Sequence, residues 1–175
     1  MTAITRNPIN QNFIHPNKFQ LNFARCPNLQ FFCQSVSVPG ISMSEIVQNT
    51  PFTDLYIPGE KPIYDLLNVT FYVDEDLKSW IEMHDWIRAM TFPTNYGEYR
   101  NLSKLNPNAI SKPQYSSASL TLLSSANNPN IVFDFVDVFP ISLSTFIVSA
   151  TDSPDSTITA DVTFRYSYYN IRPAG

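Results

Sequence analysis

The chain has 175 residues and a formal net charge of −4, and charged residues make up only 15% of it. Four glycines cannot supply the clustered glycines of a dinucleotide-binding or phosphate-binding loop. Two cysteines and two histidines are too few for a four-ligand zinc site without carboxylates. The eleven Lys and Arg form no basic cluster that could bind nucleic acid. The many aromatic and β-branched residues exclude disorder, so we expect a folded domain. From the glycine, cysteine and histidine counts we expect it to use no metal and no cofactor.

Residues 1–17 are polar with isolated apolar residues, which predicts an N-terminal arm in front of a single domain over residues 18–175. The arm lacks an apolar run of signal-peptide length, and no stretch is long and apolar enough to span a membrane. We therefore expect a soluble protein made in the cytoplasm. In that setting Cys26 and Cys33 are expected to be two buried thiols rather than a disulfide.

Alternation of apolar and polar residues predicts several strands along the chain. They lie at residues 18–25, 29–38, 66–73, 119–124, 131–138, 141–149 and 157–168. Proline-containing pairs mark turns at Pro27-Asn28 and Pro39-Gly40. The strand over 157–168 is the clearest, because its period of two persists over twelve residues.

Residues 41–65 differ from all other segments because they combine prolines with many apolar side chains. Pro51, Pro58 and Pro62 forbid a central strand or a helix interior. The segment is nevertheless too apolar for a solvated loop. We expect an extended edge or arm that packs either on its own chain or on another chain, and periodicity does not decide between the two.

One helix is predicted over residues about 75–90, with Asp74 as its N-cap and an end before Pro93. Apolar residues recur at three- and four-residue spacing and predict a stripe that faces a sheet, made of Leu77, Trp80, Ile81, His84, Ile87 and Met90. This spacing predicts Trp80 in the core and Trp86 at a flank or interface. The fold class is therefore mainly β, an antiparallel β-barrel or sandwich with one flanking α-helix.

Few residues suggest chemistry. Asp74-Glu75-Asp76 is typical of a helix start, and His84 has no second ligand at metal-binding spacing. Asp134 and Asp137 could form the carboxylate pair of a hydrolase, but positions three apart on a strand point to opposite faces unless a bulge intervenes. We expect no catalytic residues and no metal ligands. Low charge, aromatic richness and an apolar arm instead favour a subunit of an obligate assembly.

A series of short motifs in a fixed order carries a resemblance over nearly the whole chain. The motifs are Asn17-Lys18-Phe19-Gln20-Leu21, Cys33 with Val38-Pro39-Gly40, Thr50-Pro51-Phe52, Ile57-Pro58-Gly59-Glu60-Lys61, Val69 to Glu75 with Trp80 and Trp86, Phe135 to Ile141, and Thr163 to Tyr169. In this order they resemble the tail tube proteins of contractile-tailed bacteriophages. That family is related in fold to the tube protein of type VI secretion.

The resemblance implies a structural virion protein of the phage tail, assembled in the host cytoplasm. It implies homohexameric rings stacked into a hollow tube, with the tail sheath and baseplate or neck proteins as partners. DNA would pass through the lumen without specific binding during ejection, which fits a net charge of −4. The family carries an extended loop that reaches a neighbouring subunit at the place of residues 41–65. Inter-subunit contacts are therefore expected at Phe52, Leu55, Tyr56 and Ile57.

Three alternatives remain open from the sequence. Residues 94–118 match the family less closely, which allows a specialised ring, either the tube initiator at the baseplate or the terminator at the neck. A carbohydrate- or ligand-binding β-sandwich with exposed aromatic residues is a second alternative. A hydrolase that uses Asp134 and Asp137 is the third.

Overall fold

The computed structural model describes residues 12–91, 94, 97, 99–100, 102, 114–151 and 156–174. The elements with defined bounds are β1 (Phe19–Phe23), α1 (Pro27–Phe31), β2 (Cys33–Val36), β3 (Ile41–Asn49), β4 (Asp54–Tyr64), β5 (Leu67–Tyr72), α2 (Lys78–Thr91), β6 (Ser116–Leu123), β7 (Pro129–Leu143), β8 (Thr159–Arg165) and β9 (Tyr168–Pro173). The fold is mainly β with antiparallel strands, as predicted, and α2 is the expected helix. Most of the expected arm over 1–17, most of 94–118 and the expected turn at 152–155 lie outside the described residues.

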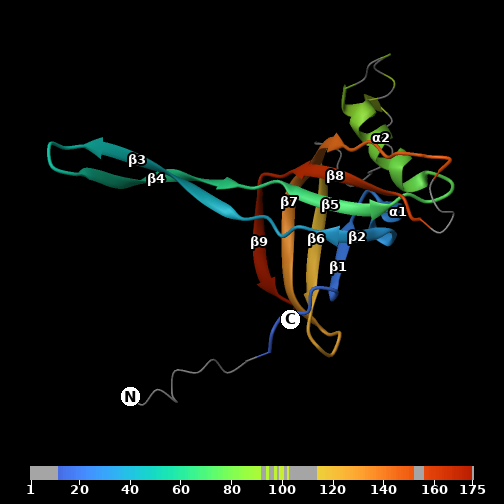
Figure 1. The fold of residues 1–175 in the computed structure, drawn as a ribbon, viewed down its shortest axis with the longest axis horizontal. Helices are drawn as coiled ribbons and strands as arrows, with labels where there is room; N and C mark the ends of the chain where they lie inside the picture. Colours follow the sequence, from blue (N-terminus) through green and yellow to red (C-terminus); the bar gives the residue numbers. More distant parts are fainter. Residues whose placement is uncertain are drawn as a thin grey trace.

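In the described residues, seven strands form one bent antiparallel sheet in the order β1-β6-β7-β8-β5-β2, with β9 paired to the edge of β7 opposite β6. The strands β1, β6, β7 and β9 lie along one axis, and β2, β5 and β8 cross that axis (Figure 1). This arrangement is a sandwich built by folding one sheet over itself. The longest strand, β7, belongs to both halves, because it pairs with β6 and β9 along its first part and with β8 along its second.

The structure differs from two of the predicted strands, one at β7 and one at β8 and β9. Residues 131–138 and 141–149 were expected to be two strands, but one strand runs through Pro140 to Leu143, and residues 144–149 are not part of a strand. Residues 157–168 were expected to be a single strand, but the chain breaks after Arg165 and continues as β9. Asp137 has a φ of 56° at the bend, so the strands paired along β7 must turn with it.

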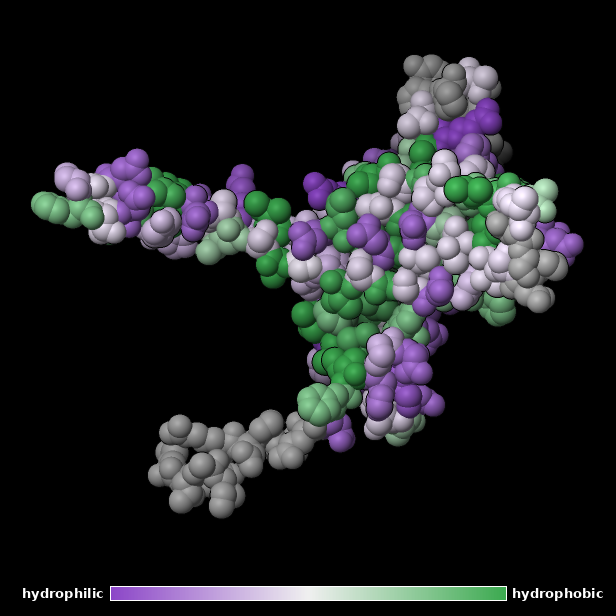
Figure 2. All heavy atoms as spheres, viewed as in Figure 1, coloured by the Kyte–Doolittle hydropathy of each residue, from purple (hydrophilic) through white to green (hydrophobic). Residues whose placement is uncertain are grey.

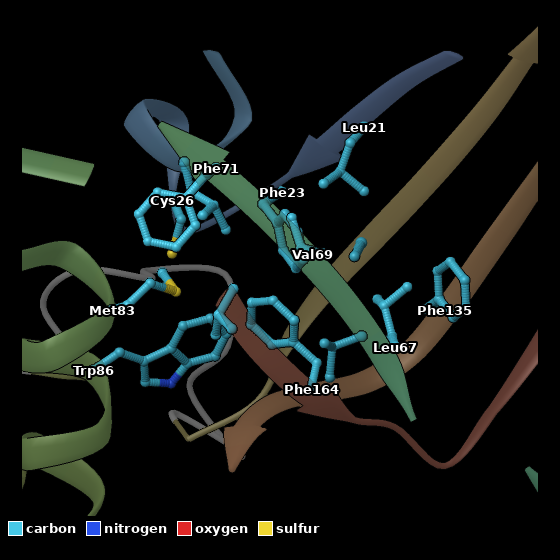
Figure 3. Packing of buried hydrophobic residues seen from close by; sticks show 14 of the residues in the cluster. Leu21, Phe23, Cys26, Leu67, Val69, Phe71, Met83, Trp86, Phe135 and Phe164 are labelled. Carbon is cyan, nitrogen blue, oxygen red and sulfur yellow. The ribbon is translucent and has the colours of Figure 1, made fainter. Parts of the chain in front are cut away.

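The core lies between the two halves of the sheet and one face of α2. Alternate residues of β5 point into it as the sequence predicts, and Leu67, Val69 and Phe71 are fully buried. Figure 3 shows Trp86 of α2 directed toward Phe164 of β8, and Met83 of α2 directed toward Cys26. The rings of Phe164 and Phe23 lie with centroids 4.8 Å apart, so strands from both halves meet in one apolar cluster.

The helix α2 begins at Lys78, three residues later than predicted. Asp74 still caps it, as predicted, although it precedes the first helical residue by four positions. Its carboxylate accepts hydrogen bonds from the backbone N–H groups of Lys78 (3.0 Å) and Ser79 (2.9 Å) and from the Ser79 hydroxyl. Burial alone would raise the pKa of Asp74, but these hydrogen bonds outweigh it and hold the pKa below its ordinary value. The intervening Leu77 takes a φ of 57°, which lets the chain turn into the helix.

The structure corrects the orientation predicted for α2. The face toward the core carries Ser79, Met83 and Trp86, and Trp86 is only 2% exposed. Trp80, expected in the core, is only partly buried at its edge, and Ile81 is exposed. Trp86 can be buried because its indole N–H donates to the carbonyl of Gln114 at 3.1 Å. Of the stripe predicted from spacing, Met90 packs against the core, whereas Trp80, His84 and Ile87 lie along a second face beside it.

A short helix replaces the start of the strand expected over 29–38. Pro27 begins α1, a position where its missing N–H has no cost. Glu82 of α2 accepts hydrogen bonds from the Asn28 side chain at 2.7 Å and from the backbone N–H groups of Asn28 and Leu29 at 3.2 and 3.3 Å. Burial nevertheless raises the pKa of Glu82 above its ordinary value. This contact spans more than fifty residues, so local periodicity does not show it.

The two cysteines are free thiols. Cys26 is buried, as expected, whereas Cys33 is only partly buried. Burial raises the pKa of Cys26 and raises that of Cys33 to about 11.

Candidate assembly interface

The strands β3 and β4 form a two-stranded sheet of their own that projects from the body of the molecule (Figure 1). All residues of β3 are exposed, as are nearly all residues of β4. Large apolar side chains are spread over its whole length, at Ile41, Met43, Ile46, Val47, Phe52, Leu55, Tyr56, Ile57 and Ile63. Figure 2 shows them interspersed with polar residues along the hairpin. A run of exposed apolar residues of this extent marks an interaction surface.

The four contact residues predicted from the sequence all lie on this hairpin. Phe52 is at the tip and is 98% exposed, and Leu55, Tyr56 and Ile57 follow on β4. The strand register places Ile57 opposite Ile46 and Tyr56 opposite Val47, so β3 adds an apolar residue to each of the two faces of the hairpin. The sequence prediction placed the contacts within residues 41–65, which include β3, but singled out only the four residues at the tip and on β4.

The prolines of β4 fit because no further strand of the described residues pairs with the hairpin. Pro62 lies opposite Met43 and Pro58 opposite Glu45, with an irregularity in the register between them. At this irregularity Gly59 approaches Ser44 so closely that an added Cβ would lie 2.5 Å from the Ser44 carbonyl oxygen. The expectation of an extended edge segment is confirmed, and its bend requires a glycine at position 59.

Two tyrosines anchor the root of the hairpin to the core. The Tyr166 hydroxyl donates to the carbonyl of Asp65 at 2.8 Å, just after β4, and the Tyr169 hydroxyl donates to the carbonyl of Pro39 at 3.4 Å, just before β3. Tyr64 packs on both rings, with centroid separations of 5.9 and 5.4 Å. Burial, helped by Tyr169 and Asp65 nearby, raises the pKa of Tyr166 to about 12. The hairpin is thus fixed at its root and free along its length.

The tip of the hairpin is ordered by its own side chains. The backbone N–H of Thr53 donates to the Thr50 hydroxyl at 3.2 Å, and that hydroxyl donates to the Thr53 carbonyl. Pro51 fixes the backbone between them. These contacts present the Phe52 ring to solvent in a fixed turn, and such preorganisation lowers the entropic cost of binding.

A second candidate surface is a groove between α2 and the end of β7, with a volume of about 590 Å³. Its lining residues are Trp80, His84, Ile87, Arg88, Thr91, Ile141, Ser142 and Leu143. Trp80 stacks on His84 with centroids 5.2 Å apart and meets Phe146 edge-on at 5.7 Å. The indole N–H of Trp80 is buried and has no hydrogen-bond partner. The groove is therefore lined by apolar side chains, one of which, Trp80, has a buried indole N–H without an acceptor among the described residues.

Residues considered for catalysis or metal binding do not assemble into such a site. Asp134 forms an ion pair with Arg172, with 2.5 Å between Oδ2 and Nε, while Asp137 lies at the bend of β7. Among the described residues, the acidic partner of His84 is Asp85, with 3.2 Å between Nδ1 and Oδ1. In the part of the chain that the structure describes, no three His, Cys, Asp or Glu residues could share a metal ion, and no helix is long and apolar enough to cross a membrane.

Comparisons with known proteins agree with this geometry. The tail tube terminator protein of Enterobacteria phage T4 is 29% identical over 153 residues, which cover 81% of this chain and 77% of that protein. The cryo-EM structure of the anti-feeding prophage tube-terminating cap superposes with a TM-score of 0.63 at 16% identity, covering 99% of this chain and 100% of the other.

Two further structures share the fold. The sheath/tube terminator of an extracellular contractile injection system, solved in the extended state, gives a TM-score of 0.61 at 15% identity, covering 93% and 98% of the two chains. A type six secretion system protein gives 0.50 at 10% identity, covering 88% and 82%. The family model described as phage tail tube protein matches residues 8–172. The chain therefore belongs to the phage tail tube protein family, and it is a structural component of the tail rather than an enzyme.

Proposed function

We propose that the chain forms a homohexameric ring that ends the tail tube at the neck. The observation that carries this assignment is the similarity to a tail tube terminator over 81% of the chain. The two structures with the highest fold similarity reported above are also described as a tube-terminating cap and a sheath/tube terminator. A main tube protein and an initiator ring at the baseplate remain the competing roles.

The hairpin gives this ring its contacts between subunits. Phe52, Leu55, Tyr56 and Ile57 pack on a neighbouring copy, together with the apolar residues that β3 places opposite them. A two-stranded hairpin is only marginally stable in water by itself, so an exposed apolar hairpin of this length gains stability when another chain covers it. Residues 18–175 act as one domain in the ring, with residues 1–17 as its arm.

The ring leaves an open lumen through which DNA passes during ejection without specific binding. The net charge of −4 and the absence of a basic cluster in the sequence support this, because phosphates are held mainly by clustered Lys and Arg. The tail sheath and the neck proteins are the further partners of the ring, which assembles in the host cytoplasm before becoming part of the virion.

The role is tested by removing the gene from a virus that carries it and imaging the lysate by electron microscopy. A terminator is expected to leave tubes of uncontrolled length that carry no heads. Complete absence of tubes would overturn the terminator role. Expression of the intact chain from a plasmid is the control, because it restores tails of uniform length.

The assembly state of the purified protein separates the proposed terminator from a main tube protein. Light scattering on a size-exclusion column, followed by negative-stain images of the same peak, is expected to show hexameric rings that do not stack into long tubes. Self-stacking tubes would identify the main tube protein instead. A strictly monomeric protein at all concentrations that is also missing from purified virions would contradict a ring function altogether.

A further inference from the structure

We propose that the groove between α2 and the end of β7 receives the tip of the β3–β4 hairpin from a neighbouring copy of this chain. The inference rests on the proposed ring and names the surface that accepts the hairpin. The knob is Phe52 with its flanking turn, and the socket is the groove around Trp80, Ile87 and Ile141.

The first argument is the second apolar face of α2. Trp80, His84, Ile87 and Thr91 recur at three- and four-residue spacing and line the groove, while the core of the same chain uses Met83 and Trp86. A helix normally carries one apolar stripe, toward its own core. The groove continues onto β7, where Ile141 is exposed. Phe146 meets the Trp80 ring edge-on, and the two residues that follow it, Ile147 and Val148, are exposed. This second stripe is left for another chain to cover.

The second argument is the unsatisfied indole of Trp80. Its Nε1 is buried within the chain without an acceptor. A buried donor without a partner costs roughly 1–3 kcal/mol, and most such donors in native proteins are satisfied. The turn Thr50–Thr53 can bring backbone carbonyl groups into the groove together with the Phe52 ring. Because Nε1 has almost no solvent-exposed surface, the Trp80 ring must shift as the tip docks before one of these carbonyl groups can accept its hydrogen bond.

The third argument is complementary charge next to the knob and next to the socket. Asp54, at the start of β4, is exposed and lies two residues after Phe52. Arg88 lines the groove and is exposed, with its guanidinium bonded to the Thr94 hydroxyl at 3.0 Å. Insertion of Phe52 would place the carboxylate of Asp54 near Arg88. Such a pair fixes the register of an interface more than it adds affinity.

The fourth argument is the placement of the two surfaces in the molecule. The tip of the hairpin and α2 lie on opposite sides of the molecule (Figure 1), so the tip of the hairpin cannot reach the groove of its own chain. A knob and a socket on opposite sides give a head-to-tail interface, and a head-to-tail interface that closes on itself produces a ring.

Disulfide cross-linking in purified tails tests the contact directly. Phe52→Cys and Ile87→Cys are combined in one chain, and mild oxidation is expected to link neighbouring copies into a ladder that ends at the closed ring. The variant with Phe31→Cys and Ile87→Cys is the matched control, because Phe31 is also a largely exposed phenylalanine, at 82% against 98% for Phe52, but lies on the body of the molecule. Each single variant controls for Cys26 and Cys33.

Charge reversal provides a second, independent measurement. Asp54→Arg alone and Arg88→Asp alone are expected to lose ring assembly, and the double variant is expected to recover it. Glu60→Arg makes the same charge change elsewhere on the hairpin and is expected to retain assembly. If the cysteine variants do not form tails, recovery by the double variant decides the question.

The outcomes separate this inference from the proposed ring. Rings that assemble normally but give no specific cross-link, together with no recovery in the double charge variant, would overturn the groove and leave the ring intact. A cross-link from Ile87→Cys to a different tail protein, such as the sheath subunit, would also overturn it. Absence of rings for the unaltered chain would overturn both proposals.

Discussion

The two most informative regions of the molecule contain the same residue types in opposite surroundings. Phe164 in the core is 0% exposed, and Phe52 at the tip of the hairpin is 98% exposed. The core satisfies its apolar side chains within one chain, through α2 and both halves of the sheet. The hairpin, with nearly all its residues exposed, leaves its apolar residues to be buried by something else. The residues that form the core and the residues that we propose for assembly thus lie in separate parts of the sequence.

The largest effect is expected in the core, for Phe164→Ala. Its ring packs against Phe23 at 4.8 Å and Trp86 at 6.2 Å between the centroids. Truncating a fully buried phenylalanine typically costs about 3–5 kcal/mol, since transfer free energy is lost and a cavity remains. Urea unfolding followed by circular dichroism measures the loss. Phe31→Ala is the control at an exposed site, and an equal loss in both variants would contradict the division between core and surface.

A smaller effect is expected where the two regions join, for Tyr166→Phe. The variant removes the hydrogen bond from the Tyr166 hydroxyl to the Asp65 carbonyl but keeps the ring in place. The expected loss of unfolding free energy is about 1 kcal/mol. Hydrogen exchange should also rise at the root of the hairpin more than in β5, because the root loses an anchor. Equal exchange in both places would show that Tyr166 does not hold the hairpin.

The same tyrosine predicts a dependence of stability on alkaline pH. Burial raises the pKa of Tyr166 from 10.0 to about 12, so the folded chain keeps the phenolic proton at pH values where the unfolded chain has lost it. The stability contributed by this group is therefore complete below about pH 10 and is lost as the pH rises toward 12. Thermal unfolding between pH 9 and 12 should show a shallower decline for Tyr166→Phe than for the unaltered chain. Parallel declines would assign the alkaline loss to other groups.

The sequence predicts those elements whose partners lie within their own pattern. The alternation in β1, β5 and β8 follows from a sheet with one buried face, and the Asp74 cap follows from the chemistry of a helix start. The prolines of residues 41–65 correctly predict an extended edge segment. A proline has no backbone N–H to donate to a second neighbouring strand, so it is placed where a strand pairs on only one side.

The elements that sequence reasoning misses depend on distant partners. The helix α1 needs Glu82, the root of the hairpin needs Tyr166 and Tyr169, and the buried Trp86 needs the carbonyl of Gln114. For α2, two apolar faces share the same helical spacing, and periodicity alone does not say which one meets the core. The stripe chosen from the sequence includes Trp80, His84 and Ile87, which line the groove instead.

The smallest effect on stability and a large effect on assembly are expected together for Phe52→Ala. The side chain makes almost no contact within its own chain, so the free energy of unfolding should change by less than about 0.5 kcal/mol. Ring formation, in contrast, should be lost, because a large aromatic residue at the centre of an interface is the type that alanine substitution penalises most. Urea unfolding and light scattering on the same sample measure both quantities. Thr53→Ala is the control variant next to Phe52, because it removes a side chain at the tip but leaves the Phe52 ring and the Thr50 hydroxyl in place. If Phe52→Ala lowered stability as much as Phe164→Ala, the hairpin would belong to the folding unit, and the separation of folding from assembly would fail.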